Sequence, residues 1–406
     1  MLIRRHAEAT ITRIAAMFGA VLVTGARQVG KTTLLQSISR PARYVTLDDP
    51  VALAAAREHG ATFLKENPPP VFFDEIQYAP ELFPYIKMHI DRSRGKGLFY
   101  MSGSQQFTLM KNVSESLAGR LGVLTLPGIS LREQTGVAYD QPFLPDDAYF
   151  AGRKQDCRAV AYDDVWRRIQ RGSMPELCAN PEFDWRIFHA SYVKTYIERD
   201  VRDLTQVGDE LRFIRFMTAA AAATGQLLNL ASLARDVGIS QPTAERWLSI
   251  LRTANLIALL QPWSVNVSKR AVKTPKLYFL DTGLAAWLTG WNTAETLRQG
   301  AMAGPFFETF VVSEILKSYN NAGIDERLFF YRDRDGVEID LLLWRDGWLH
   351  PIEIKKHAEA DKRDCKSFAM LDKLSGVERG PGGVVCLYDD IVPLTATDRT
   401  IPVWMI

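Results

Sequence analysis

The stretch from Ala20 to Leu34 reads AVLVTGARQVGKTTL, a short apolar run that leads into a complete G-x-x-x-x-G-K-T loop. The apolar run predicts a buried strand, and a helix is expected to begin at the end of the loop. Glycines let the backbone curl so that successive N–H groups face a phosphate, while the lysine and the first threonine reach the phosphate oxygens and Mg²⁺. We therefore expect ATP and Mg²⁺ as cofactors, with ATP bound by Gly25, Ala26, Arg27, Gln28, Val29, Gly30, Lys31, Thr32 and Thr33.

Two later apolar runs, 44–47 and 71–73, also end in acidic residues, and the second is followed by Asp74 and Glu75. Strands that alternate with helices predict a parallel sheet, which binds its ligands at the carboxyl ends of its strands. Asp74 is suited to hold Mg²⁺ together with Thr32, and Glu75 to polarise the water that attacks the γ-phosphate. This is a Walker B pattern.

A fourth predicted strand, 97–101, ends in small polar residues, so that Ser104 or Gln105 is placed to contact the γ-phosphate. A helix is then expected to run to Arg120, just before a fifth predicted strand at 123–126. An arginine in this position is commonly a solvated surface residue.

The order of these features resembles the core of an AAA+ ATPase. The resemblance implies that Arg120 reaches the nucleotide of a neighbouring subunit, where a guanidinium stabilises charge on the γ-phosphate and couples turnover to assembly. The resemblance thus implies a homo-oligomer, for which a ring is one possible arrangement. It also implies that Lys31, Glu75 and Arg120 are catalytic.

Further segments extend the resemblance over most of the chain: SESLAGR at 114–120, PGISLRE at 127–133, YIERD at 196–200, NVSKR at 266–270 and PKLYF at 275–279. They resemble a broad group of bacterial and archaeal AAA+-type ATP-binding proteins whose carboxyl-terminal half is a domain of unknown function. The resemblance implies an ATPase domain but does not indicate a specific biological function.

The middle of the chain is predicted to be helical. Residues rich in Asp, Pro and Gly at 134–161 predict an irregular connection, and apolar residues recur at helical spacing over 184–204. The charged run from Glu198 to Asp203 reads either as an exposed, salt-bridged face or as a segment that brings Arg199 near a nucleotide or subunit interface.

Residues 230–251 predict a helix-turn-helix, with Ser240 as the cap of the second helix, and strand-like runs at 256–260 and 276–280 make the unit look winged. The second helix offers few residues that read bases. Residues 261–280 carry no acid, and four of their side chains are candidate phosphate contacts: Lys269, Arg270, Lys273 and Lys276. Winged helices also serve as packing modules, so DNA is one of two interpretations.

The carboxyl-terminal third begins with a predicted buried helix, 305–316, and continues with three hairpin-linked strands, 328–331, 337–344 and 348–355. Asp340, Glu353 and Lys355 on these strands, with Glu308 on the helix, resemble the PD-(D/E)xK nuclease fold, although Ile339 stands where the nominal motif has proline. In that fold two acids hold Mg²⁺ and the lysine positions or activates water. The alternatives are a hairpin with exposed charges and a nuclease-like fold without activity.

We therefore predict an α/β protein: a P-loop AAA+-like parallel sheet, a helical and winged-helix region, and a small α/β domain like a restriction endonuclease. The predicted divisions are an ATPase core (1–135), a linker and helical region (136–215), a winged-helix-like domain (216–285) and a nuclease-like domain (286–406). At 406 residues and 47% hydrophobic content, the chain is long enough for several cores.

The composition indicates how charge is distributed and which cellular environment to expect. The formal net charge is only +2, so any basic surface must be local. The four cysteines form no C-x-x-C pair, and no apolar run is long enough to cross a membrane, so we expect a reducing, cytoplasmic environment without a membrane partner.

The main functional hypothesis is an oligomeric Mg²⁺-dependent ATPase that couples hydrolysis to action on nucleic acid, by DNA binding or remodelling. One alternative is a nucleotide-regulated Mg²⁺-dependent nuclease. The other is a signalling or toxin-antitoxin-like ATPase that binds a protein partner.

Overall fold

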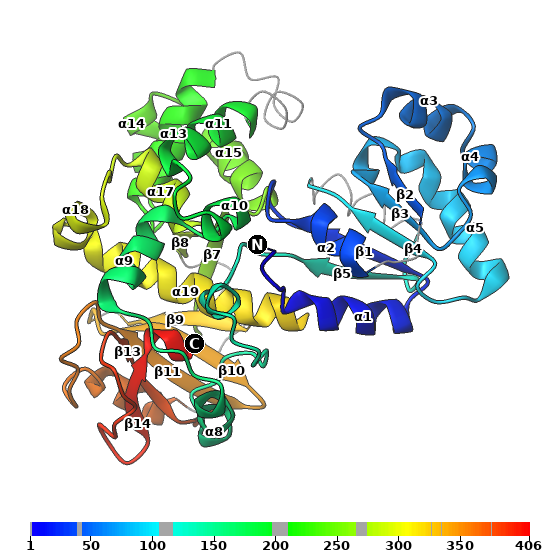
Figure 1. Cartoon of the computed structure of the whole chain (residues 1–406). Helices are drawn as coiled ribbons and strands as arrows, with labels where there is room; N and C mark the ends of the chain where they lie inside the picture. The colour runs from blue at the N-terminus through cyan, green and yellow to red at the C-terminus, as the bar shows by residue number, and fades with distance from the viewer. Residues whose placement is uncertain are drawn as a thin grey trace.

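The computed structural model describes residues 2–38, 43–104, 117–196, 210–264, 274–325, 327–333, 335–374 and 376–406. Figure 1 shows an amino-terminal α/β unit beside a helical region, with a second sheet formed by the carboxyl-terminal part of the chain. No helix in these ranges is long and apolar enough to cross a membrane.

The first sheet is entirely parallel, with strand order β2-β3-β4-β1-β5. Alternate residues of β1 face two different cores, because Val21 and Val23 pack on one side of the sheet while Ala20 and Leu22 pack on the other. A strand that is buried on both faces is apolar throughout, as the sequence suggested. The strands and their helices are β1 (Ala20–Thr24), β2 (Arg43–Thr46), β3 (Val71–Asp74), β4 (Phe99–Ser102), β5 (Leu121–Thr125), α1 (Ala7–Met17), α2 (Lys31–Ile38), α3 (Pro50–Glu58), α4 (Gly60–Glu66) and α5 (Phe83–Ser93).

Short helices connect this sheet to the rest of the chain. Ser130 caps the first of them in a complete capping box with Glu133. The helices of this region are α7 (Leu131–Thr135), α8 (Asp147–Gln155), α9 (Tyr162–Arg171), α10 (Pro175–Ala179), α11 (Trp185–Tyr196) and α13 (Glu210–Ala222). The second half of the amphipathic helix expected at 184–204 lies outside the described residues.

The two helices expected at 230–251 are present as α14 (Leu230–Val237) and α15 (Gln241–Thr253), and the Ser240 hydroxyl accepts the Thr243 N–H at the cap. The antiparallel strands β7 (Ile257–Pro262) and β8 (Lys276–Phe279) follow, and β6 (Gln226–Leu227) pairs with β8.

A second sheet runs from this region into the carboxyl-terminal part, because β7 also pairs in parallel with β9. The strands expected at 328–355 form an antiparallel ladder, in agreement with the expected hairpins. The division predicted at residue 285 remains a prediction, but hydrogen bonding continues across the two parts that it would separate. The remaining strands are β9 (Leu328–Arg332), β10 (Glu338–Arg345), β11 (Trp348–Ile354), β12 (Glu378–Arg379), β13 (Gly382–Cys386) and β14 (Asp398–Pro402).

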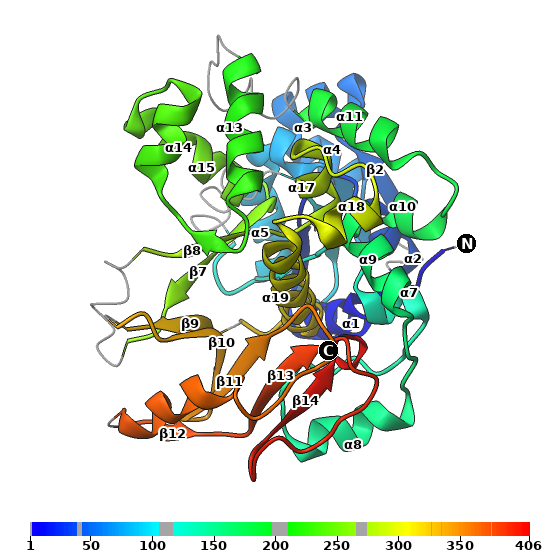
Figure 2. The ribbon, with the colours of Figure 1, turned by 90° about the vertical axis from the view of Figure 1, so that its left-hand side faces the viewer.

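The buried helix α19 (Ala303–Ala322) joins the three parts of the chain. It packs against α1 and β5 of the first unit, against β8, and against β11 of the second sheet. Figures 1 and 2 show α19 passing between the helical region and the second sheet, whereas α17 (Thr282–Leu288) and α18 (Ala294–Gln299) lie above it in the helical region. Helix α19 therefore contacts both sheets directly.

Candidate functional site

The phosphate loop leaves β1 at Gly25, whose φ of 140° favours glycine. A Cβ on Gly25 would lie 2.3 Å from the carbonyl oxygen of Leu126, so no other residue fits without a shift of the backbone. Gly30 has a φ of 90° immediately before α2. Both loop glycines thus stand where the sequence pattern requires them, and the loop ends at the amino terminus of a helix.

Lys31 is buried, with its side chain folded over the loop. Its Nζ donates to the carbonyl oxygens of Gly25 at 3.1 Å and Ala26 at 2.8 Å. The ammonium group is therefore held beside the loop on which a triphosphate would lie.

The Asp74 carboxylate at the end of β3 meets Thr32 at the start of α2. The Thr32 hydroxyl donates to the two carboxylate oxygens at 2.9 and 3.1 Å. The predicted pair is thus brought together, and a hydroxyl with a carboxylate is an oxygen donor set of the kind that Mg²⁺ takes beside substrate phosphates.

Two further hydroxyls orient Asp74, and the sequence reasoning missed both roles. Tyr44 on β2 donates to Oδ2 at 3.0 Å, and Ser102 at the end of β4 donates to Oδ1. Burial and the Asp74 charge raise the pKa of Tyr44 to about 12, so its hydroxyl stays a donor at neutral pH. The sequence feature that could have indicated these roles is the position of Tyr44 and Ser102 on the two strands that flank β3.

Glu75 follows directly in the left-handed backbone conformation, with φ 56°. Its carboxylate Oε2 accepts from Gln77 Nε2 and, at 3.3 Å, from the Ser104 hydroxyl. Non-glycine residues in this conformation cluster at functional sites. Ser104 therefore lies beside the predicted catalytic acid, and Gln77, on the short 3-10 helix Ile76–Tyr78, is a positioning residue that the sequence reasoning missed.

A cavity of about 470 Å³ adjoins the phosphate loop and is lined by residues of α2, the amino-terminal segment and α10. Its apolar lining includes Ile3, Leu34, Ile129 and Pro175. Ligand sites of this size are commonly apolar with a few polar groups.

Arg5 ties the phosphate loop to the segment that leads into the rest of the chain. Its guanidinium donates to the carbonyl oxygens of Val29 at 2.8 Å and Pro127 at 2.6 Å, and to the Glu133 carboxylate at 3.1 Å. Asn321 of α19 also donates to Glu133, at 3.3 Å. Helix α19 is thereby connected to the nucleotide loop by a short chain of buried polar contacts.

We expect Arg5→Ala to lower the free energy of unfolding by about 3–5 kcal/mol, because it leaves the buried Glu133 carboxylate without its cation. Although burial alone would raise the pKa of Glu133, Arg5 and backbone donors hold it below its ordinary value of 4.5. A lowered folded pKa means that the pair stabilises fully above about pH 4.5 and progressively less at lower pH.

Thermal and urea unfolding at pH 7 and in acid measure both effects. The adjacent Arg4→Ala is the matched control, because the Arg4 side chain is 84% exposed. Equal melting temperatures for the two variants would contradict the assignment.

Arg120 lies at the other end of the sheet from the phosphate loop. Its carbonyl oxygen accepts from the N–H of Ala20, the first residue of β1, whereas the loop follows the last residue of that strand. The guanidinium pairs with Asp91 of α5 at 2.5 Å. The distance between the two ends of β1 keeps Arg120 away from the phosphate loop of its own chain.

Two of the acids predicted for the carboxyl-terminal part, Glu308 and Asp340, lie beside a residue from another part of the chain. The Lys276 Nζ on β8 lies 2.9 Å from Glu308 Oε1, 2.5 Å from Glu338 Oε1 and 4.0 Å from Asp340 Oδ1. Lys276 is only 3% exposed. The prediction that it contacts phosphate at the surface is therefore wrong, since its charge is used inside the fold.

Asp340 and Lys355 make further contacts in the carboxyl-terminal part of the chain. Asp340 Oδ2 accepts the N–H of Ile354 at 2.8 Å, and Lys355 Nζ donates to Glu353 at 2.7 Å. Burial and neighbouring Asp340 raise the pKa of Glu308 to about 7 and that of Glu353 to about 8.

Several predicted residues cannot be placed. Gln105, the run 198–203 and the basic residues Lys269, Arg270 and Lys273 lie outside the described ranges. Within those ranges, no group of three or more His, Cys, Asp or Glu side chains is arranged to hold a metal ion, and all four cysteines are free.

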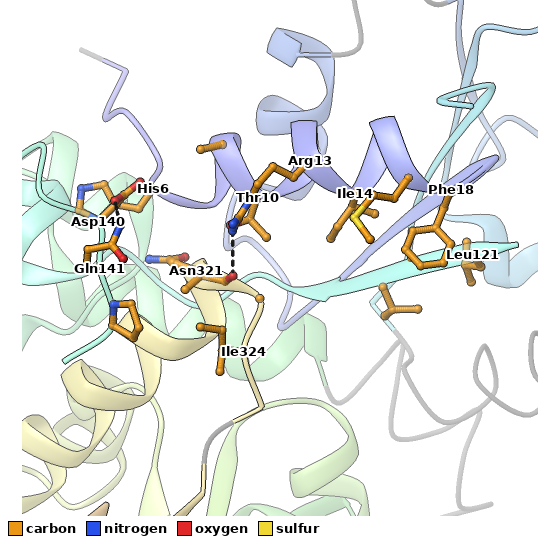
Figure 3. Close-up of a pocket in the computed structure, with 17 residues that line it drawn as sticks. His6, Thr10, Arg13, Ile14, Phe18, Leu121, Asp140, Gln141, Asn321 and Ile324 are labelled. Atoms are coloured by element: carbon orange, nitrogen blue, oxygen red, sulfur yellow. Dashed lines mark hydrogen bonds between the residues drawn. The ribbon is translucent and has the colours of Figure 1, made fainter. Parts of the chain in front are cut away.

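A second hollow, of about 750 Å³, lies where α1 and β5 meet the end of α19 (Figure 3). Arg13 bridges it by donating to the carbonyl oxygen of Ala322 at 3.2 Å. None of the site residues expected from the sequence lines this hollow.

Comparison with known proteins divides the chain in three. Residues 18–135 match the family model of the AAA domain, residues 162–295 match a domain of unknown function (DUF8612), and residues 303–406 match another (DUF4143). The uncharacterized proteins Rv2008c of Mycobacterium tuberculosis and Mb2031c of Mycobacterium bovis are each 30% identical over 370 residues. The match covers 91% of this chain and 77% of each relative.

Solved structures give more distant matches. The Walker-type ATPase PABY2304 of Pyrococcus abyssi matches 71% of this chain and 96% of its own, with a TM-score of 0.45 and 16% identity. AMPPCP-bound DnaA from Aquifex aeolicus matches 61% of this chain and 85% of its own, with a TM-score of 0.27 and 14% identity.

Proposed function

The chain belongs to the family of these two mycobacterial proteins and carries an AAA-type P-loop ATPase domain, and from this premise we propose that it is an oligomeric, Mg²⁺-dependent ATPase acting on nucleic acid. The observation that carries the proposal is the contact between Thr32 and Asp74, because it joins the phosphate loop to the acidic end of β3.

Each residue of the site has a part in this function. Thr32 and Asp74 would hold Mg²⁺, which when bound neutralises charge on the β- and γ-phosphates. Lys31 replaces its contacts to the loop carbonyls with contacts to phosphate oxygens. Glu75 orients and deprotonates the attacking water, while Gln77 and Ser104 fix the direction of its carboxylate.

The cavity beside the loop is where we place the nucleotide base. It adjoins Gly30 and Thr33, so a triphosphate on the loop can continue into it. Its apolar lining suits the faces of a purine ring.

Lys31→Ala should weaken ATP binding by about 10- to 100-fold and abolish measurable hydrolysis, because hydrogen bonds to a charged phosphate are lost. Isothermal titration with a non-hydrolysable ATP analogue and phosphate release measure the two effects. Lys65→Ala, which removes an exposed lysine of α4, is the control. ATP hydrolysis at the wild-type rate by Lys31→Ala would refute the ATPase assignment.

The action on nucleic acid rests on the region that follows the helix-turn-helix. Basic residues Lys269, Arg270 and Lys273 lie between β7 and β8 in the sequence. On α15 the exposed side chains include Gln241, which donates to the acidic Glu245 at 3.2 Å, and this favours contacts to phosphate over the reading of bases.

ATP turnover with and without DNA tests this coupling. The proposal expects stimulation by DNA that declines steeply with salt, since phosphate contacts release counterions. If fluorescence anisotropy at low salt finds no DNA affinity, the alternative of an ATPase that binds a protein partner is favoured.

A nucleotide-regulated, Mg²⁺-dependent nuclease is the second candidate. It is favoured by the convergence of Glu308, Asp340 and Glu353 with Lys355 at one end of the β10–β11 hairpin. A metal-dependent cleavage assay on single-stranded, duplex and branched DNA tests it, with Asp340→Ala as the inactive reference.

A further inference from the structure

The acidic cluster of the third part does not fit a divalent metal ion as it is folded. In the predicted pattern Asp340 and Glu353 would hold the ion and Glu308 would complete the site, yet Glu308 and Asp340 both face the Lys276 ammonium group, at 2.9 and 4.0 Å. Two of the three carboxylates of the predicted metal site are thus already beside a cation of this protein.

The Lys276 side chain is buried and held in this position by several contacts. It is 4% exposed, it comes from β8 and not from the strands that carry the acids, and its Nζ also meets Glu338 at 2.5 Å. The Tyr278 hydroxyl, two residues further along β8, donates to Glu308 at 2.6 Å. Two side chains of one strand therefore occupy the same carboxylate.

The distances leave little separation between Lys276 and a metal ion at these carboxylates. An ion bound to a Glu308 oxygen at about 2.1 Å would lie within about 5 Å of the ammonium group. Two cations so close together in a buried site repel each other, so Lys276 weakens the binding of a metal ion to these carboxylates.

We propose that Lys276 is the resident cation of the Glu308–Glu338–Asp340 cluster, and that it keeps this cluster from binding a divalent metal ion. This proposal counts against the second candidate function, a metal-dependent nuclease in the carboxyl-terminal part of the chain. Instead, the lysine fastens β8 to α19 and β10, so that the region after the helix-turn-helix and the third part move together.

The test counts bound Mn²⁺ by electron paramagnetic resonance at pH 8. All variants carry Asp74→Asn, so that the nucleotide site does not contribute. Asp74→Asn alone should bind no Mn²⁺ that depends on Asp340, whereas adding Lys276→Met should create one Mn²⁺ site that depends on Asp340. A third change, Asp340→Asn, should remove that site, and Lys366→Met, at an exposed lysine of the same part, should not create one.

Two results would overturn the proposal. One is Mn²⁺ binding by Asp74→Asn that disappears in Asp74→Asn with Asp340→Asn, because the metal then binds with Lys276 present. The other is a folded Lys276→Met variant that binds no additional ion. The comparison of Asp74→Asn with and without Asp340→Asn leaves Lys276 unchanged. It therefore tests whether metal binds beside Lys276 even if the Lys276→Met variant does not fold. ATP hydrolysis by chains with intact Asp74 is measured separately, so a failure of the ATPase assignment is distinguishable.

Discussion

Glu75→Gln should slow ATP hydrolysis by about 10²- to 10⁴-fold, the usual contribution of a positioned general base. ATP binding should change little, because Thr32 and Asp74 remain in contact and the phosphate loop is untouched. Glutamine keeps the size of the side chain and can still accept a hydrogen bond from Gln77 or Ser104. What it loses is the ability to take a proton from water.

Phosphate release under single-turnover conditions and titration with ATP measure the two parts of this prediction. Glu81→Gln, an exposed acid on the next 3-10 turn (Pro80–Leu82), is the control and should hydrolyse ATP normally. A Glu75→Gln variant with wild-type turnover would mean that another group activates the water.

The sequence carries enough information to predict the AAA-type P-loop domain because the signals of that domain are local. A strand that is buried on both faces is an uninterrupted apolar run, and the loop that follows β1 has a fixed spacing of glycine, lysine and threonine. Asp74 could be paired with Thr32 from the order of strands and helices alone, because parallel strands end at the same edge of a sheet.

Contacts between distant parts of the chain could not be predicted in this way. Arg5 and Glu133 are separated by 128 positions, and nothing in the spacing of either residue indicates the other. Lys276 shows that the charge of a segment does not by itself predict whether a lysine is exposed. In a stretch without acids it resembled a surface residue, but its partners Glu308 and Glu338 come from later elements that fold against it.

Arg120→Ala is the second change with a large expected effect. If Arg120 acts on the nucleotide of a neighbouring subunit, its loss should slow ATP hydrolysis by about 10³- to 10⁵-fold, as for other arginines that stabilise phosphoryl transfer. The structure strengthens the case for action between subunits, because Arg120 stands beside the first residue of β1 and the phosphate loop follows its last.

The resting partner of Arg120 is compatible with this role. Its ion pair with Asp91 is at the surface, with 34% of the arginine side chain and 43% of the aspartate side chain exposed. An exposed pair is weak, so the guanidinium can exchange a carboxylate for a phosphate. Asp91→Asn should accordingly leave turnover intact, and so should Arg92→Ala, which removes an exposed arginine of the same helix.

Mixing two inactive variants tests the role between subunits. In a mixture of equal parts Arg120→Ala and Glu75→Gln, half of the subunits keep Glu75, and half of those have a neighbour that keeps Arg120. About a quarter of the sites in a closed oligomer should then regain hydrolysis. Recovery requires that the two variants assemble together, which co-purification through a tag on one of them verifies. Mixed oligomers that remain inactive would show that Arg120 does not complete a neighbour's site, and its ion pair with Asp91 would then be its principal contact.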